Sequence, residues 1–292
     1  MFENPSSSTW FHDDVSLFRE AIEQSAANSG LRAQLIEKDY YGSIFLGDHS
    51  ILFDNGLVFK GGTCLSKVYN DFFRLSEDLD FSISISSDET RSKRREAWAP
   101  IKEHFSNVCE RIPFFKSMEN YRGGNENRHY QGRFAYESAI SGEIDFIKVE
   151  VSLRELLLLK PVLLKARTFL THPDTGKEVM QPVPVLVPQL IEAYAEKIRA
   201  AVSRKDPAIR DFFDVDHAVR HARIHPDDPQ LSDLVAMKLS VSGGDKVDLS
   251  KKRIDSLRDQ LESQLRPVLR SIDYDAFDLD RAILFLQAIT KR

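Results

Sequence analysis

The sequence contains little cysteine, no long apolar run and no excess of positive charge. Its two cysteines, Cys64 and Cys109, are too few for a disulfide framework or a four-thiolate zinc site. The longest apolar stretch, Leu156–Leu159, ends at Lys160 and is too short to span a bilayer. Residues Met1–Asp14 lack the apolar segment of a signal peptide. We therefore expect a cytoplasmic protein with no membrane span.

The charge balance limits how the chain can contact nucleic acid. The 292 residues carry 40 lysines and arginines against 45 acidic residues, a net charge of −5. This balance argues against a protein that coats nucleic acid through its overall charge. Contact with RNA must use a local basic patch, and the densest basic run is Arg91–Arg95. Such a run is more often a solvated helix end, so both interpretations stay open.

Hydrophobic periodicity predicts an α/β (α+β) fold in three parts. We expect N-terminal helices over residues 1–50, a mixed α/β core over 51–170, and a helical domain over 171–292. Within the core and its border, the patterns predict one helix and several strands. These are a helix over 91–117, strands at Leu57–Phe59 and Leu79–Ile85, a hairpin of 128–140 with 143–153, and an edge strand at Val183–Val187.

A glycine pair followed by two aspartates is the main candidate for chemistry. Lys60 ends a short apolar strand and leads into Gly61 and Gly62, after which a helix pattern begins. Glycine permits close approach of a ligand, and a helix N-terminus attracts phosphate. Asp78 and Asp80 then lie two apart on a strand, which places both carboxylates on one face. Each half alone is commonly a plain turn or a solvated strand, but together they favour a magnesium and phosphate site.

Three further charged residues are candidates for the same site. Glu150 shares a strand face with Phe146 and Lys148, and it would supply a third metal ligand if its strand lay beside that of Asp80. An exposed sheet face explains Glu150 equally well. Lys197 and Asp211 lie at the margins of the apolar arcs of two helices. Each is either a half-solvated margin residue or part of a phosphate site.

Several other polar residues in the helical half receive simpler interpretations. His217, His221 and His225 are spaced by four, which suits a metal, but their helical angles favour a solvated face. Arg210 and Asp214 are spaced as an i,i+4 ion pair on that same face. One further residue of this helix, Asp216, falls inside the apolar arc, and the sequence does not explain it.

Taken in order, these segments resemble the AbiEii family of nucleotidyltransferase toxins. The resemblance is carried by an ordered set of matches and not by any single motif. The matching segments are Ile36–Tyr41, Phe59–Tyr69, Arg74–Phe81, Ala195–Arg204 and Arg210–Asp214.

The resemblance implies a polymerase-β-like nucleotidyltransferase core with a mixed sheet and a helical C-terminal region. It implies that Asp78 and Asp80 bind Mg²⁺, with Mn²⁺ as a substitute, and that Lys197 and Asp211 complete the catalytic site. It also implies a set of residues that contact the triphosphate of the NTP substrate. These are Gly61, Gly62, Thr63, Ser76 and Lys197.

The resemblance further implies transfer of a nucleoside monophosphate from NTP to RNA, with tRNA as the expected target. Such transfer would block translation within a toxin–antitoxin and phage-defence system, beside a winged-helix antitoxin. Two alternatives remain open at this point. The same core could modify a small molecule or a protein hydroxyl, or the chain could be a non-catalytic nucleotide-binding module.

Overall fold

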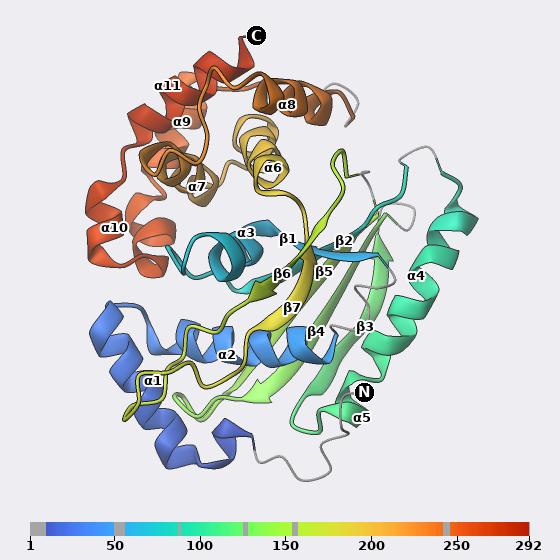
Figure 1. Ribbon diagram of the computed structural model, residues 1–292, viewed down its shortest axis with the longest axis vertical. Coiled ribbons are helices and arrows are strands. Elements are labelled where there is room, and N and C mark those ends of the chain that lie inside the picture. Colours follow the sequence, from blue (N-terminus) through green and yellow to red (C-terminus); the bar gives the residue numbers. More distant parts are fainter. Residues whose placement is uncertain are drawn as a thin grey trace.

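The computed structural model describes residues 10–49, 56–86, 89–124, 128–153, 157–241 and 246–291. A central sheet lies between N-terminal helices and a group of C-terminal helices (Figure 1). The mixed α/β core and the helical C-terminal region expected from the sequence are both present. The expected boundaries at residues 50 and 170 stay predictions.

The N-terminal part forms two helices, and the first of them carries clear capping signals at both ends. A short turn, η1 (Phe11–Asp13), leads to α1 (Val15–Ser29), where the Asp14 carboxylate accepts a hydrogen bond from the Leu17 amide. Gly30 ends α1 in the left-handed conformation. The next helix, α2 (Ala33–Asp48), is buried on most sides and packs against the sheet.

The core is a five-stranded mixed sheet in the order β1-β2-β5-β4-β3. Only β2 and β5 run parallel; the other neighbours are antiparallel. The predicted hairpin is confirmed as β4 and β5, with Glu137 opposite Ile144. The strands are β1 (Leu57–Lys60), β2 (Asp78–Ile83), β3 (Lys116–Gly124), β4 (His129–Glu137) and β5 (Ile144–Ser152).

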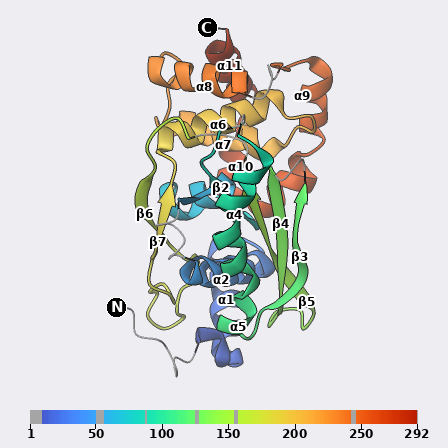
Figure 2. The same cartoon turned by 90° about the vertical axis from the view of Figure 1, so that its right-hand side faces the viewer.

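One face of this sheet is covered by helices and the other is half-exposed. Along β4 and β5 buried residues alternate with partly exposed ones, as a sheet packed on one side requires. Figure 2 shows α2 and α4 (Arg91–Ser106) on the covered side, while β3, β4 and β5 border the opposite side of the described part of the chain.

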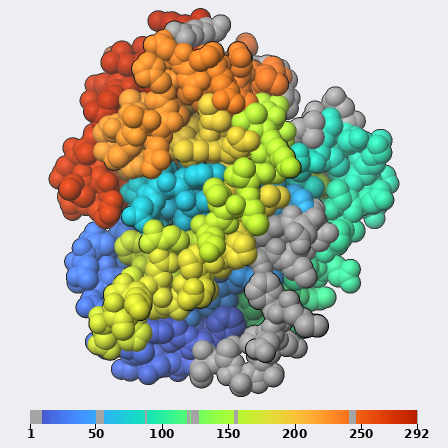
Figure 3. Space-filling model, in the orientation of Figure 1, coloured from blue at the N-terminus to red at the C-terminus, as the bar shows by residue number. Residues whose placement is uncertain are grey.

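The connection from β1 to β2 is helical. It begins as α3 (Gly61–Cys64) and widens into η3 (Leu65–Tyr69). A two-stranded sheet of β6 (Val162–Ala166) and β7 (Val183–Val187) lies across the front of the molecule (Figure 3). The edge strand predicted at Val183–Val187 is therefore confirmed, whereas its partner β6 was not expected.

The helix predicted over 91–117 is too long. The structure has α4, then the short α5 (Val108–Arg111), and β3 from Lys116. Residues 116–117 instead pair with β4 and extend the sheet by one strand.

The C-terminal helical region, α6 to α11, stands above the sheet in Figure 1. Its first two helices carry the charged residues singled out in the sequence. The elements are α6 (Leu190–Ser203), α7 (Ile209–Arg220), α8 (Pro229–Val241), α9 (Lys251–Arg258), η4 (Leu261–Leu265), η5 (Arg266–Val268), α10 (Ser271–Ala276) and α11 (Leu279–Thr290).

Candidate active site

The glycine pair forms a tight turn directly against charged side chains. Gly61 has a φ of 78°, a conformation that favours glycine. A Cβ at Gly61 would stand less than 3.0 Å from the carboxylate of Asp80. At Gly62 it would meet the guanidinium of Arg74 just as closely and would also approach Ser76. The two glycines therefore let the backbone pass beside the carboxylate and the guanidinium.

Three carboxylates lie on one face of two adjacent parallel strands. Asp80 of β2 is directly opposite Glu150 of β5, and Asp78 is opposite Lys148. All four side chains fall on the half-exposed face, since the residues between them are buried. The position expected of Glu150, on the strand next to Asp80, is confirmed.

The cluster holds more negative charge than its surroundings neutralise. Burial, followed by the neighbouring charges of Glu150 and Asp78, raises the pKa of Asp80 to about 6. Lys60 and Lys197 oppose this shift only in part. The pKa of Asp78 is also raised, chiefly by burial. A divalent cation would relieve this repulsion, and carboxylate oxygens are the ligands that Mg²⁺ prefers.

Lys148 is a cation within the cluster to which the sequence analysis gave no role. Its Nζ lies 2.5 Å from Glu150 Oε1 and 3.8 Å from Asp78 Oδ2. Burial disfavours the charged amine, but these carboxylates outweigh that effect and raise the pKa of Lys148. The strand alternation that placed Lys148 beside Glu150 was the signal for this contact.

Thr63 and Ser76 lie at the turn, as expected. The Thr63 hydroxyl is buried and donates a hydrogen bond of 2.5 Å to the backbone carbonyl of Asp78. This bond joins the start of α3 to the first carboxylate strand. Ser76 is partly exposed beside Gly62, so its hydroxyl is the more accessible of the two.

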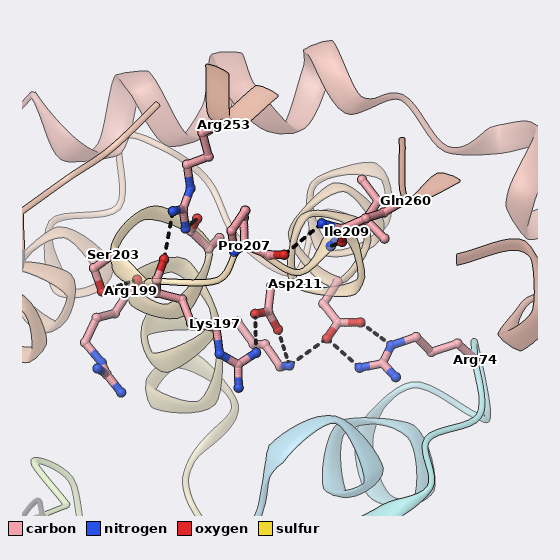
Figure 4. A network of polar contacts seen from close by, with 12 residues as sticks. Arg74, Lys197, Arg199, Ser203, Pro207, Ile209, Asp211, Arg253 and Gln260 are labelled. Carbon is pink, nitrogen blue, oxygen red and sulfur yellow. Dashed lines mark hydrogen bonds and ion pairs between the residues drawn. The ribbon is translucent and has the colours of Figure 1, made fainter. Parts of the chain in front are cut away.

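The helical region brings Lys197 and Asp211 together at this side of the core. Lys197 Nζ lies 2.8 Å from Asp211 Oδ1 and 3.0 Å from Asp214 Oδ2 (Figure 4). Burial disfavours the charged amine, but Asp211 and Asp214 outweigh it and raise the pKa of Lys197. Lys197 is therefore a fixed positive charge, and Arg204 holds the other oxygen of Asp211 at 3.1 Å.

The same network reaches back to the core through Arg74. The guanidinium of Arg74 donates two hydrogen bonds to Asp214, of 2.6 and 2.8 Å, and both residues are buried. The expected pairing of Arg210 with Asp214 on a solvated face is therefore wrong. Asp214 is fully buried because it faces the core, and its partners there are Arg74 and Lys197.

Two other expectations for α7 need correction or completion. His217 is only 7% exposed and packs on Phe73, so the solvated face does not extend to it. Asp216, left unexplained by the sequence, is fully buried and accepts hydrogen bonds from Arg220 of its own helix and Arg281 of α11. It therefore fastens α7 to α11.

A second bridge between the core and the helical region starts at Lys60. Its Nζ lies 3.1 Å from Glu196 Oε1 on α6. Burial alone would raise the pKa of Glu196, but Lys60 and Lys238 lower it to about 2. Because Lys60 precedes Gly61 and acts on Asp80, this bridge fixes the glycine turn relative to α6.

Among the described residues, one group of three potential metal ligands has its ligand atoms within 4.8 Å of one another: Asp48, His49 and His104. Arg111 already binds both oxygens of Asp48, and the Nδ1 of His49 is hydrogen-bonded to the carbonyl of Phe45. His217, His221 and His225 do not form such a group. The carboxylates at the glycine turn do not meet this spacing either.

Comparison with known proteins agrees with this architecture. Two solved structures have the same fold: JHP933 from Helicobacter pylori and a candidate nucleotidyltransferase from H. pylori. The first has a TM-score of 0.51 at 16% identity and covers 89% of this chain and 92% of its own. The second has a TM-score of 0.52 at 15% identity, and the match covers 89% of this chain and 95% of that structure's chain. No curated protein matches the sequence.

In the described part of the chain, no helix has the length and apolar character needed to cross a membrane.

The model of one protein family, described as nucleotidyl transferase AbiEii toxin of type IV toxin–antitoxin systems, matches residues 45–283. The matched segment runs from α2 to α11 and includes the glycine turn, the carboxylate strands and the Lys197 network. The chain therefore belongs to the AbiEii nucleotidyltransferase toxin family.

Proposed function

We propose that this enzyme transfers a nucleoside monophosphate from NTP to RNA with the help of Mg²⁺ or Mn²⁺, and that tRNA is the target. The observation that supports this most directly is the convergence at the glycine turn. Asp80 lies against this turn and shares a sheet face with Asp78 and Glu150. Lys197 of the helical region, which is paired with Asp211, is close enough for its charge to act on Asp80. Transfer of a nucleotidyl group needs metal ligands, a place for phosphates and positive charge beside them.

Each group has a role that follows from its surroundings. Asp78, Asp80 and Glu150 would hold the metal, because their oxygens share one face and their charges lack full compensation. The bound metal would neutralise phosphate charge in the transition state. Gly61 and Gly62 leave room for phosphate beside the backbone, with the accessible hydroxyl of Ser76 next to them.

Lys197 would provide positive charge at the phosphates. Its pKa is raised by Asp211 and Asp214, so it stays protonated throughout the physiological range. Asp211 in turn orients Lys197, because one oxygen binds the amine and the other binds Arg204. Thr63 fixes the turn to β2 through its hydroxyl and would contact the triphosphate only through its backbone.

The acceptor can be identified with α-labelled nucleotides. Each of the four NTPs is incubated with the protein, total RNA and Mg²⁺, and the label is then located by electrophoresis. We expect label in RNA of tRNA size, none in the presence of EDTA and none with Asp80→Ala. Label in protein or in a small molecule would contradict the RNA assignment, and label transfer by Asp80→Ala would contradict the metal assignment.

The family also implies a cognate antitoxin. We propose that this partner is a winged-helix protein and that the toxin acts in the cytoplasm by blocking translation. Expression of the toxin alone should stop incorporation of labelled amino acids, and co-expression of the winged-helix partner should restore it. Continued protein synthesis during toxin expression would contradict the proposed block of translation.

A further inference from the structure

The carboxylate cluster already contains a cation supplied by the chain itself. On the paired strands, Lys148 stands opposite Asp78 and Glu150 stands opposite Asp80. The amine of Lys148 contacts Glu150 at 2.5 Å and reaches Asp78 at 3.8 Å. The ammonium therefore bridges the two strands on the face where the metal is proposed to bind.

The bridging amine occupies one oxygen of Glu150, and the carboxylates are not drawn together as metal ligands would be. In the described part of the chain, the ligand atoms of Asp48, His49 and His104 all lie within 4.8 Å of one another. The carboxylate oxygens of Asp78, Asp80 and Glu150 are spread more widely than this. A divalent ion must bring its ligand oxygens to about 2 Å from itself. Its binding would thus require Glu150 to leave Lys148 or Lys148 to move.

We propose that Lys148 is an internal counter-ion of the cluster, which a divalent metal must displace in order to bind. The proposal rests on the proposed function, because it takes these carboxylates to be the metal site. Two positive charges cannot share the cluster without repulsion. Lys148 therefore weakens binding of the free metal ion and neutralises part of the negative charge of the empty cluster.

This arrangement favours entry of the metal together with its nucleotide. A free ion meets the full repulsion of the ammonium. An ion that carries a triphosphate brings negative charge, which compensates Lys148. The wild-type enzyme is then expected to bind Mn²⁺ alone weakly and to bind it better in the presence of NTP.

The test measures Mn²⁺ binding by calorimetry, without nucleotide, in four proteins. Lys148→Met removes the charge and keeps the apolar length of the side chain, whereas Lys148→Arg keeps the charge. Lys165→Met is the matched control, since Lys165 is exposed on β6. We expect Lys148→Met to bind Mn²⁺ about tenfold more tightly than wild type, or about 1.4 kcal/mol. The other two variants should bind as weakly as wild type.

The failure of this proposal can be separated from that of the proposed function. Asp80→Asn should abolish the calorimetric signal if the metal binds in the cluster. If Asp80→Asn binds Mn²⁺ like wild type, the metal site itself is wrong. If Asp80→Asn abolishes binding but Lys148→Met binds no more tightly than wild type, only the role of Lys148 is overturned.

A second measurement uses the wild-type chain and covers the case in which Lys148→Met does not fold. Lysine acetylation is followed by mass spectrometry with and without Mn²⁺. Displacement from Glu150 should increase the acetylation of Lys148 while leaving that of Lys165 unchanged. An unchanged or reduced acetylation of Lys148 would overturn the proposal.

Discussion

At the scale of single residues, Asp80 is constrained from several sides. It is enclosed by the backbone of Gly61, it faces Glu150 across the strand pair, and its pKa is raised to about 6. Such a carboxylate destabilises the metal-free fold when it is ionised. This cost is consistent with a residue kept for binding and not for stability.

Replacing Asp80 should therefore stabilise the metal-free protein. Because folding raises its pKa from 3.8 to about 6, the folded chain binds this proton more tightly, and its contribution to stability falls as pH rises through that interval. At pH 7 in EDTA, Asp80→Asn should raise the free energy of unfolding by about 1–3 kcal/mol. Urea denaturation of both proteins at pH 5 and pH 7 measures this difference in the free energy of unfolding.

A control for that experiment is Asp145→Asn on β5. Asp145 is also half-buried, but it has a lysine partner, with Lys38 Nζ at 3.0 Å. Loss of this pair should leave stability unchanged or lower it. If Asp80→Asn is no more stable than wild type at pH 7, the raised pKa is wrong.

The glycine turn allows a test of geometry independent of charge. Gly61→Ala should lower stability by about 1–3 kcal/mol through backbone strain, and it should also reduce nucleotidyl transfer because its Cβ pushes against Asp80. Gly142→Ala is the matched control, since Gly142 has a φ of 73° and nothing within 4 Å of its Cβ position. It should share the strain but keep full activity. Equal activity of the two variants would rule out the contact with Asp80.

At the scale of elements, local sequence patterns predicted the strands better than they predicted which side chains pair with each other. The alternation around Leu79 and the hairpin turn at Gly142 predicted β2, β4 and β5, because those strands expose one face. By contrast, β3 was missed, because the predicted helix ran on through α5 into the first two residues of this strand and no strand was predicted for the rest of it. The strand pair β2–β5, which aligns Asp80 with Glu150, is a long-range contact that periodicity cannot give.

Partners within the helical region were the hardest to predict. Lys197 and Asp211 were placed at helix margins from their angles alone. The structure turns that margin toward the core, where Arg74 provides a buried partner for Asp214. Only the packing of α7 against the core distinguishes Asp214 from the solvated residue that its helical spacing with Arg210 suggested.

The buried pair of Arg74 and Asp214 should be indispensable to the junction between core and helices. Asp214→Asn leaves the guanidinium of Arg74 without a full counter-charge and should cost about 3–5 kcal/mol in the free energy of unfolding. Exposed Asp280, 3.4 Å from Arg258, is the control and should cost at most about 1 kcal/mol as Asp280→Asn. Urea denaturation compares them, and equal losses would contradict the structural role of the buried pair.

At the scale of the whole molecule, the net charge of −5 is compatible with the proposed RNA substrate because the charge is locally arranged. Several acidic residues are buried in ion pairs or gathered at the proposed metal site. On α4, Arg91, Lys93 and Arg95 are exposed, whereas Arg94 is buried and bonded to the carbonyl of Glu89. The predicted patch therefore presents three cations instead of four.

The proposed binding of RNA should accordingly depend on salt through few phosphate contacts. Replacing both Arg91 and Arg95 by serine should reduce the slope of log K against log salt by about 1.4, or about 0.7 for each single-strand phosphate contact. The double variant Lys251→Ser and Lys252→Ser, on the exposed side of α9, should leave the slope unchanged. Filter binding at several salt concentrations measures both. An unchanged slope in the α4 variant would exclude this patch from the RNA interface.

We propose that one active site is shared between the carboxylate strands and the helical region. The most direct measurement is the rate of label transfer from NTP to RNA by wild type, Lys197→Met and Lys165→Met, each at saturating Mg²⁺. We expect Lys165→Met to match wild type and Lys197→Met to lose about 10²- to 10³-fold in rate, as for removal of a charge aimed at the transition state. Transfer by Lys197→Met at the wild-type rate would contradict a shared site.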